Sequence, residues 1–359
     1  MAPYLSKAWR DTEFEFRGRV LRGETAPPPR WEQVLHAINT AAGPMLGREY
    51  AARYLTADTR SRAETVATNV RDALGRAVDR TTWMSDAAKA EAKAKLAALK
   101  IEIGTPRRDL DYTVQPMGRG SFGGNMLIAS TWRHREEMKR IGRGNADRRW
   151  DVLPQEPALA YDLAQNRLIV TAAMLQPPVL DMAREGASHY GAYGALVGHE
   201  LSHAVAGKGQ LVDASGNIRT WWTPVEQSAW ESLGQRISVQ YGGFDYPALQ
   251  GIKVNGSQTR ESNLADVSGL DLAFDAYRQA TPEATKEAKQ AFFRGWAQLW
   301  AQQSSPEAAT ERAATSVHAP GAVRVNAALQ NQPAFGEAFG CKAGTPMQVK
   351  AEGQIRVWP

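Results

Sequence analysis

The polar and apolar positions between residues 31 and 100 repeat with the period of an α-helix. Side chains three and four residues apart share one helix face, so an apolar stripe at that spacing marks a face that packs on a core. A third helix is expected to begin after Ser85, a residue type that caps helix N-termini, and to end near Gly104. We interpret these helices as scaffold. The recurring apolar positions are Val34, Ile38 and Ala42, then Val66, Val70, Leu74 and Val78.

The segments that follow change in composition and in period. Glycine and arginine become frequent between residues 105 and 150, which we interpret as a linker with an edge strand and a helix near residues 130–141. Beyond it, β-branched and aromatic side chains predict strands at Tyr161 and at residues 167–171, with Asn166 in the turn between them.

Three amphipathic helices are predicted in the C-terminal part of the chain. Thr223 and Pro224 are the residue types preferred at an N-cap and at the first helical position. The predicted helices cover residues 226–241, 261–280 and 286–303.

The stretch 191–209 carries the candidate chemistry. On a predicted buried helix, His199 and His203 are four residues apart and therefore lie on one face. Two imidazoles at this spacing can bind one zinc ion, and Glu200 beside them can take a proton from zinc-bound water. Only 6 histidines occur in 359 residues, so this pattern seldom arises by chance, although a buried helix with two unrelated histidines remains the alternative. A neighbouring edge strand is where a peptide substrate could pair.

Composition excludes several classes of protein. Hydrophobic residues make up 43% of the chain, enough for a packed core. The net charge of +5 is spread without a long basic run, so no nucleic-acid surface is expected. No run approaches 18 apolar residues, so no membrane span is expected, and the first residues lack the layout of a signal peptide. The single cysteine, Cys341, excludes an internal disulfide and a cysteine-based metal site.

Several separated motifs resemble those of the neprilysin family of zinc metallopeptidases, in its bacterial, oligoendopeptidase O-like form. The resemblance runs from about Trp31 to Trp358. In chain order the family motifs are PRW, WM, IGYP, LQPP, NYGG, VIGHE, WWT, NG, ENIAD, HxPxxxR and RVW. Their counterparts are Trp31, Trp83-Met84, Ile103-Gly104, Asn166 with Leu175-Gln176-Pro177-Pro178, Tyr190-Gly191, Val197-Gly198-His199-Glu200, Trp221-Trp222-Thr223, Asn255-Gly256, Asn263, Ala265, Asp266, His318, Pro320, Arg324 and Arg356-Val357-Trp358.

The resemblance implies a mainly α-helical (α+β) protein with a thermolysin-like zincin catalytic domain, a small sheet and a helical lid. We expect a partial lid segment at residues 1–110, a linker with an edge strand at 111–150, and the catalytic domain at 151–359. The implied cofactor is one Zn²⁺ ion and the implied partners are short peptide substrates. A periplasmic or extracellular location is expected rather than a cytoplasmic one.

The resemblance also implies roles at the metal. His199 and His203 would bind zinc, and Glu200 would act as the base. Asp266 would orient a zinc-binding histidine from behind, which makes the imidazole a better ligand.

Further roles are implied at the substrate. His318 would stabilise the oxyanion and Arg324 would hold a substrate carbonyl; the alternatives are a core histidine and a surface arginine. Tyr161 remains from the family motif NAxY, but its asparagine, which pairs with the substrate backbone, falls on Ala158.

The third zinc ligand departs from the family pattern. The glutamate of ENIAD falls on Ser262, and the nearest glutamate is Glu261. One step along a helix turns a side chain by about 100°, so Glu261 either enters through a local bulge or leaves the site a ligand short. Family acidic residues after the second histidine are replaced by Val205-Ala206-Gly207, and the chain is about half the family's length, lacking the N-terminal half of the lid.

Two hypotheses follow from these departures. The first is a zinc endopeptidase that cleaves short peptides with a Glu-activated water. The second is a catalytically impaired homologue that acts as a peptide-binding or partner subunit. In one version of the second, another chain supplies the missing half of the lid.

Overall fold

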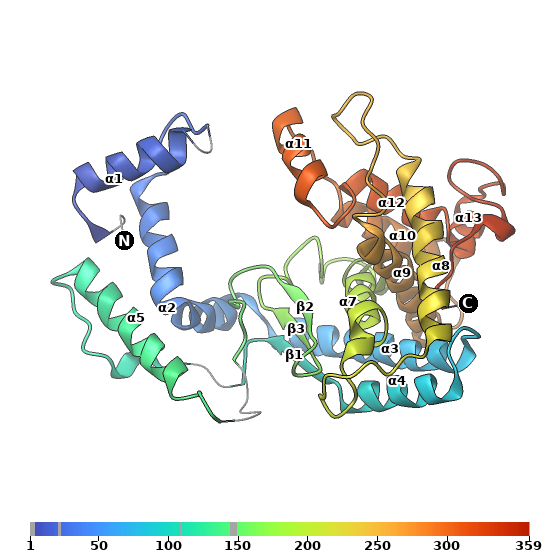
Figure 1. Ribbon diagram of the computed structural model, residues 1–359, viewed down its shortest axis with the longest axis horizontal. Helices are drawn as coiled ribbons and strands as arrows, with labels where there is room; N and C mark the ends of the chain where they lie inside the picture. The colour runs from blue at the N-terminus through green and yellow to red at the C-terminus, as the bar shows by residue number, and fades with distance from the viewer. Residues whose placement is uncertain (1–3, 21–22, 108–109, 144–148, 359) are drawn as a thin grey trace. The chain divides into compact units, whose positions relative to one another are not determined.

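The fold of the described residues is mainly helical, with one small sheet (Figure 1). The expected fold class is therefore confirmed. The computed structural model describes residues 4–20, 23–107, 110–143 and 149–358. The chain divides into two compact units, each built from two separate segments. The first unit comprises residues 1–54 and 105–156, and the second comprises residues 55–104 and 157–359.

Helices make up the first unit. They are α1 (Lys7–Glu13), α2 (Arg30–Tyr54) and α5 (Phe122–Met138), with a π-helical segment at Phe14–Val20 and a 3-10 turn at Tyr112–Val114. Helix α2 packs on α5 around a small core that includes Ala41, Tyr112 and Met126. It bends at Ala42, where φ is −139°, because Pro44 lies inside the helix and cannot continue regular hydrogen bonding.

The second unit contains the remaining helices and the sheet. Its α-helices are α3 (Ala57–Arg80), α4 (Asp86–Ala98), α6 (Gly186–His189), α7 (Ala195–Val205), α8 (Pro224–Gly242), α9 (Arg260–Ala280), α10 (Lys286–Leu299), α11 (Pro306–Thr315), α12 (Gly321–Leu329) and α13 (Pro333–Phe339). A π-helical segment, Tyr190–Gly194, joins α6 to α7, and 3-10 turns lie at Gly207–Leu211 and Ala351–Gly353.

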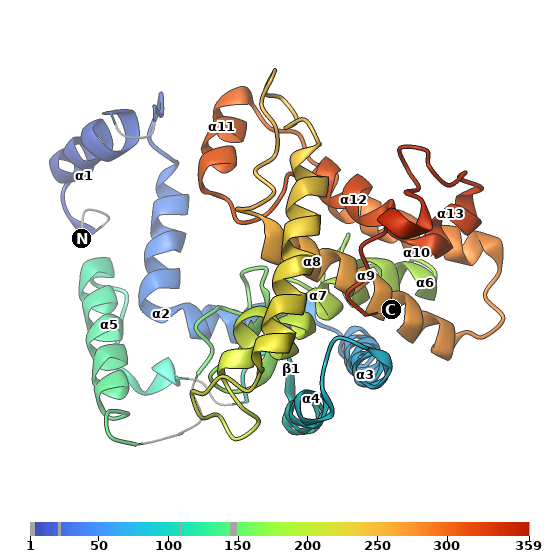
Figure 2. The same ribbon diagram turned by 45° about the vertical axis from the view of Figure 1, so that its right-hand side comes forward.

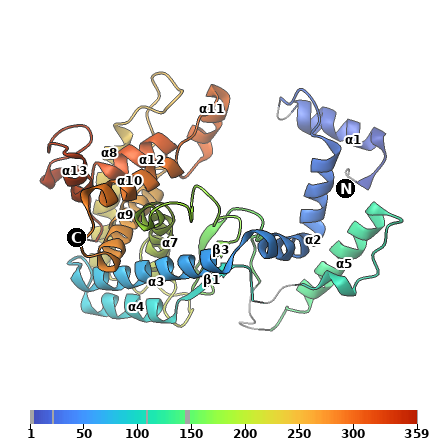
Figure 3. The same cartoon turned by 180° about the vertical axis from the view of Figure 1, so that it is seen from behind.

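Helix α9 is the centre of this unit. It contacts α3, α7, α8 and α12, and its buried face is almost continuous from Ser262 to Tyr277. Helices α3 and α4 run side by side (Figure 3). The C-terminal helices α10, α12 and α13 lie together near α9 (Figure 2).

The sheet has three strands in the order β1-β3-β2. Strand β1 (Lys100–Gly104) is parallel to the central β3 (Arg167–Thr171), and β2 (Leu159–Asp162) is antiparallel to it. Every residue of β3 is buried. Strands β1 and β2 are the two edges. The predicted turn residue Asn166, between β2 and β3, has a positive φ of 45°.

A cluster of tryptophans joins distant parts of the second unit. Trp83, which follows α3, packs edge-on against Trp222 and at a tilt against Trp230 and Trp358, with centroid separations of 5.4, 5.9 and 5.6 Å. Its indole Nε1 donates to the carbonyl of Val357 at 3.0 Å. The motifs WM, WWT and RVW, far apart in sequence, therefore serve one packing core.

Some predicted boundaries differ from the observed ones. The third helix ends at Ala98, not near Gly104, because residues 100–104 pair with β3 instead. The last predicted helix ends at Leu299. In the described part of residues 111–150 no strand is present, and helix α5 occupies the stretch.

The observed units also cut the chain differently from the expected boundaries at residues 110 and 150. Residues 55–104 join the second unit because β1 pairs with β3 and α3 packs on α9. Among the described residues, no helix has both the length and the apolar character needed to cross a bilayer.

Candidate functional site

The predicted metal-binding pair lies on α7. The two rings of His199 and His203 are 5.1 Å apart between centroids and are inclined at 80°. His199 is buried and His203 is half-buried. The i, i+4 spacing therefore places both imidazoles on one face, as predicted.

Two glycines bring this face against α9. A Cβ built on Gly198 would lie 2.8 Å from the Cα of Gly269, and one built on Gly269 would lie 2.7 Å from the backbone nitrogen of His199. Any side chain at either position would clash, so the two helix backbones touch directly. This close approach lets an α9 side chain reach His199.

That side chain is Asp266. Its Oδ1 lies 2.7 Å from Nδ1 of His199, and its two oxygens accept hydrogen bonds from Nε and Nη2 of Arg324 at 2.7 and 2.5 Å. Burial alone would raise the pKa of Asp266, but Arg324 and the hydrogen bonds hold it well below its usual value. An ionised carboxylate only accepts, so His199 must donate from Nδ1 and present the lone pair of Nε2.

The pKa values of the other two histidines of the site are lowered. Burial, together with nearby His199, lowers the pKa of His203 to about 3. Burial and the charge of Arg324 lower the pKa of His318. The His318 ring lies 6.2 Å from that of His199 between centroids, so the structure brings these predicted residues together.

Glu200 faces the edge strand. Its Oε2 accepts a hydrogen bond from the backbone N–H of Tyr161 in β2 at 2.9 Å. Burial raises the pKa of Glu200, and the proximity of His199 and this hydrogen bond offset part of the rise. A carboxylate with a raised pKa is suited to accept and return a proton near neutral pH.

The structure does not bring Glu261 to the two histidines. Its side chain is 44% exposed, pairs with Arg260 at 3.4 Å, and approaches Gly207 beyond the end of α7. Ser262, at the family's ligand position, is buried in the first turn of α9. In the described ranges, no set of three His, Cys, Asp or Glu side chains is arranged to hold a metal ion.

The donor set nevertheless fits zinc in part. Asp266 engages Nδ1 of His199, which leaves Nε2 as its potential ligand atom, and the lowered pKa of His203 favours the unprotonated ring that zinc requires. The site thus supplies two of the three protein ligands that a catalytic zinc takes.

The predicted substrate residues are placed as follows. Arg324 is buried, and its Cζ lies 3.6 Å from the ring centroid of Trp300, which sequence reasoning missed. The backbone of Ala158 is bonded within the hairpin, because its N–H donates to Thr171 Oγ1 and its carbonyl accepts from the Thr171 N–H. Ala158 has no side-chain amide to offer a substrate. The phenol of Tyr161 donates to Asn166 Oδ1 at 2.8 Å.

Gly269 was also missed. A lone glycine three positions after Asp266 in a predicted helix was a usable signal, because such a glycine usually has a packing reason. The stacking of Trp300 on Arg324 had no comparable signal in the sequence.

Comparison with known proteins identifies similar sequences along nearly the whole chain. The profile of Peptidase family M13 matches residues 160–355, and a second profile with the same description matches residues 1–106. Human neprilysin is 26% identical over 371 residues, which is 99% of this chain and 49% of neprilysin. Mouse membrane metallo-endopeptidase-like 1 is 26% identical over 372 residues, 99% of this chain and 48% of its own length. The chain therefore spans about half the length of these curated relatives.

Solved structures agree with the sequence comparison. The zinc metalloprotease Zmp1 of Mycobacterium tuberculosis, solved with an inhibitor, superposes with a TM-score of 0.87 at 28% identity, covering 100% of this chain and 56% of that one. PepO from Lactobacillus rhamnosis gives a TM-score of 0.88 at 28% identity, covering 99% and 56%.

Proposed function

The chain belongs to Peptidase family M13, and from this membership and the site geometry we propose that it is a zinc-dependent endopeptidase acting on short peptides. One observation carries the proposal. His203 and His318 lie beside His199, Asp266 contacts His199 from behind, and Glu200, next in sequence to His199, faces β2. A helix with a purely structural role does not require a buried carboxylate that fixes the tautomer of a histidine.

Each residue has a role that its contacts support. His199 and His203 would hold the zinc ion, which supplies a Lewis acid for the scissile carbonyl and for water. Glu200 accepts the proton of the attacking water and passes it to the leaving amine. Strand β2 is at an edge of the sheet and can offer backbone groups to an extended substrate, apart from the N–H of Tyr161, which donates to Glu200.

The remaining groups act on the developing charge. His318 stands next to His199 and donates a hydrogen bond toward the oxyanion. Arg324 has two of its donor nitrogens committed to Asp266, which leaves Nη1 for a substrate carbonyl. Its charge is held in place by Asp266 and by the ring of Trp300.

Metal content of the purified protein tests the proposal. We expect the wild type to bind one zinc ion weakly, and Ser262→Glu to bind it at least about tenfold more tightly, because that change restores a carboxylate at the family's ligand position. Glu261→Gln is the matched control and should leave zinc binding unchanged. A lower zinc affinity in Glu261→Gln than in the wild type would contradict this account of the site. So would the absence of bound zinc in both the wild type and Ser262→Glu.

A second candidate function is favoured by the position of Glu261. Because this carboxylate points toward Gly207 and Ser262 replaces the family ligand, a peptide-binding homologue with little or no catalysis is the alternative. In that case Glu200→Gln would leave the biological role unchanged. An assay of that role in cells that carry only the Glu200→Gln form separates the two candidates.

Partner and location complete the proposal. The relatives are about twice as long, so a second chain that supplies the rest of the lid is a proposed partner. Size measurement after co-expression with the neighbouring gene product tests it, and an active monomer of this chain alone would exclude it. We place the protein in the periplasm or outside the cell, which fractionation checks.

A further inference from the structure

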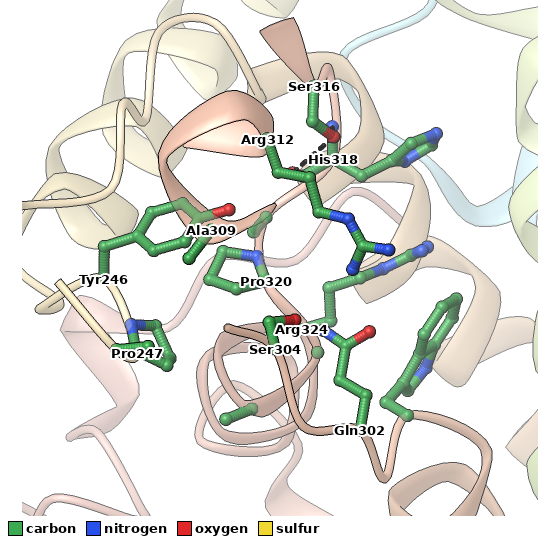
Figure 4. Close-up of a pocket in the computed structure, with 15 residues that line it drawn as sticks. Tyr246, Pro247, Gln302, Ser304, Ala309, Arg312, Ser316, His318, Pro320 and Arg324 are labelled. Carbon is green, nitrogen blue, oxygen red and sulfur yellow. Dashed lines mark hydrogen bonds between the residues drawn. The ribbon is translucent and has the colours of Figure 1, made fainter. Parts of the chain in front are cut away.

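A cavity of about 240 Å³ lies next to the candidate active site in the second unit (Figure 4). His318 and Arg324 line one part of it, so it communicates with the reacting centre. Its other polar lining side chains include Tyr246, Gln302 and Arg312. No Asp or Glu is among the residues that line it.

Arg312 is the unusual member of this lining. It lies on α11 and is exposed, and within the described part of the chain its guanidinium has neither a carboxylate partner nor a side-chain hydrogen bond. Figure 4 shows its side chain pointing toward Arg324. The charge of Arg324 is already balanced by Asp266, whereas the charge of Arg312 is not. The cavity therefore carries one uncompensated positive charge.

An unpaired guanidinium in a lining that contains no Asp or Glu matches an acceptor that is negatively charged.

We propose that this cavity binds a carboxylate of the peptide, with Arg312 as the residue that sets this preference. The inference rests on the proposed function, because it names the chemistry of the peptides that the site takes. A guanidinium binds a carboxylate through paired, charge-assisted hydrogen bonds, which gives both affinity and direction. The carboxylate comes from an acidic side chain near the scissile bond or from the free C-terminus of a short peptide.

Binding without turnover tests the proposal. Fluorescein-labelled heptapeptides are titrated by anisotropy against the Glu200→Gln protein, which separates binding from cleavage. One peptide has a central Glu and an amidated C-terminus, a second has Gln in its place, and a third has Gln and a free carboxylate. We expect the Glu peptide, the free-carboxylate peptide or both to bind at least about tenfold more tightly than the neutral one. The source of the carboxylate is identified by the peptide, central-Glu or free-carboxylate, that binds more tightly than the neutral peptide.

Substitutions at Arg312 attribute the preference to this residue. Arg312→Gln in the same background should remove the preference and leave binding of the neutral peptide unchanged. Arg312→Glu should invert the preference, so that a peptide with a central Lys binds more tightly than the peptide with a central Glu. Arg278→Gln is the matched control, because it removes the same charge from an exposed arginine of the second unit that does not line the cavity.

The outcomes separate this inference from the proposed function. Equal affinity for acidic and neutral peptides, or loss of the preference in Arg278→Gln as well, would overturn the role of Arg312. The wild type is assayed in parallel for cleavage of the same peptides. Cleavage without a charge preference refutes only the inference, and a charge preference without cleavage refutes only the catalytic function.

Discussion

At the scale of single residues, the Asp266 carboxylate has the largest influence on the site. It is fully buried, fixes the tautomer of His199 and neutralises Arg324 at the same time. A buried ion pair broken from one side leaves an uncompensated charge, which typically costs about 3–5 kcal/mol. Asp266 therefore supports both the fold and the orientation of His199, the proposed metal ligand.

Replacement of this carboxylate should affect stability and metal binding together. Asp266→Asn keeps the shape but leaves Arg324 buried without its partner, so we expect a loss of about 3–5 kcal/mol in the free energy of unfolding. Zinc affinity should fall by about 10–100-fold, because the neutral amide oxygen is a weaker acceptor for His199 Nδ1 than the carboxylate is. Urea denaturation and calorimetric zinc titration measure the two effects.

Asp275→Asn is the matched control for that change. Asp275 is also on α9 and also pairs with an arginine, Arg76 at 2.6 Å, but the pair is partly exposed. Loss of a partly exposed pair should cost less than about 1 kcal/mol and leave zinc binding unchanged. If both variants behaved alike, the special role of Asp266 would be refuted.

The residues that could carry the chemistry were predictable from the sequence, but whether they form a complete metal site was not. The spacing of His199, Glu200 and His203, and the order of Asp266, His318 and Arg324, were enough to predict residues that the fold gathers. Glu261 could not be decided from sequence, because helix geometry alone left a bulge and a missing ligand equally open. The contact of Arg324 with Trp300 depends on tertiary packing that no local pattern encodes.

At the scale of elements, the direct contact between α7 and α9 positions the site. Gly198 and Gly269 face each other without side chains between them, which is the condition for Asp266 to reach His199. The His199–His203 spacing with its apolar flanks predicted α7, amphipathic periodicity predicted α9, and α8 began at its predicted cap. Helix pairing was not predictable, because an amphipathic pattern indicates a buried face but not its partner.

A methyl group between these helices should separate them. In Gly198→Ala the new Cβ would lie 2.8 Å from the Gly269 backbone, so we expect a loss of about 1–3 kcal/mol in stability and weaker zinc binding. Gly75→Ala on α3 is the control, because a Cβ there meets nothing within 4 Å. That control should stabilise by about 0.5–1 kcal/mol. If urea denaturation showed Gly198→Ala to be as stable as the wild type, the close contact would be refuted.

Helix α8 provides a test of pH dependence. Glu226 is buried in its capping box and accepts hydrogen bonds from the backbone N–H groups of Thr223 and Ser85 at 2.9 Å each. Burial alone would raise the pKa of Glu226, but hydrogen bonds from the side chains of Ser85 and Thr223 and from the Ser85 backbone lower it to about 2. A lowered folded-state pKa means that the stabilisation is present above the ordinary value near 4.5 and is lost as the pH falls toward 2.

The expected result is an acid-sensitive stability that depends on this carboxylate. Between pH 7 and pH 3, the wild type should lose stability more steeply than Glu226→Gln, because the amide does not titrate. Urea midpoints measured at several pH values give the two slopes. Glu261→Gln, which removes a partly exposed carboxylate, serves as the control and should keep the wild-type slope. Equal slopes for wild type and Glu226→Gln would contradict the assigned role of the cap.

At the scale of the whole molecule, each unit is built from two segments that are separate in sequence. Residues 55–104 join the second unit through the parallel pairing of β1 with β3 and through the tryptophan cluster around Trp83. The change in composition at residue 105 predicted a boundary there. Nothing in the composition predicted that residues 55–104 pack with residues 157–359 in one unit. A strand of five residues directly after a helix, as in β1, has too little periodic signal to be separated from the helix end.

We propose that this family member keeps a working zinc-peptidase centre although Ser262 replaces a ligand. Side-by-side measurement of zinc content and peptide cleavage in wild type and Glu200→Gln tests it most directly. We predict zinc in both proteins, cleavage of a quenched fluorescent peptide by the wild type, and a rate lower by about 10²–10⁴-fold in the variant. Wild-type protein that is free of zinc and inactive, or a variant that cleaves as fast as the wild type, would contradict the account.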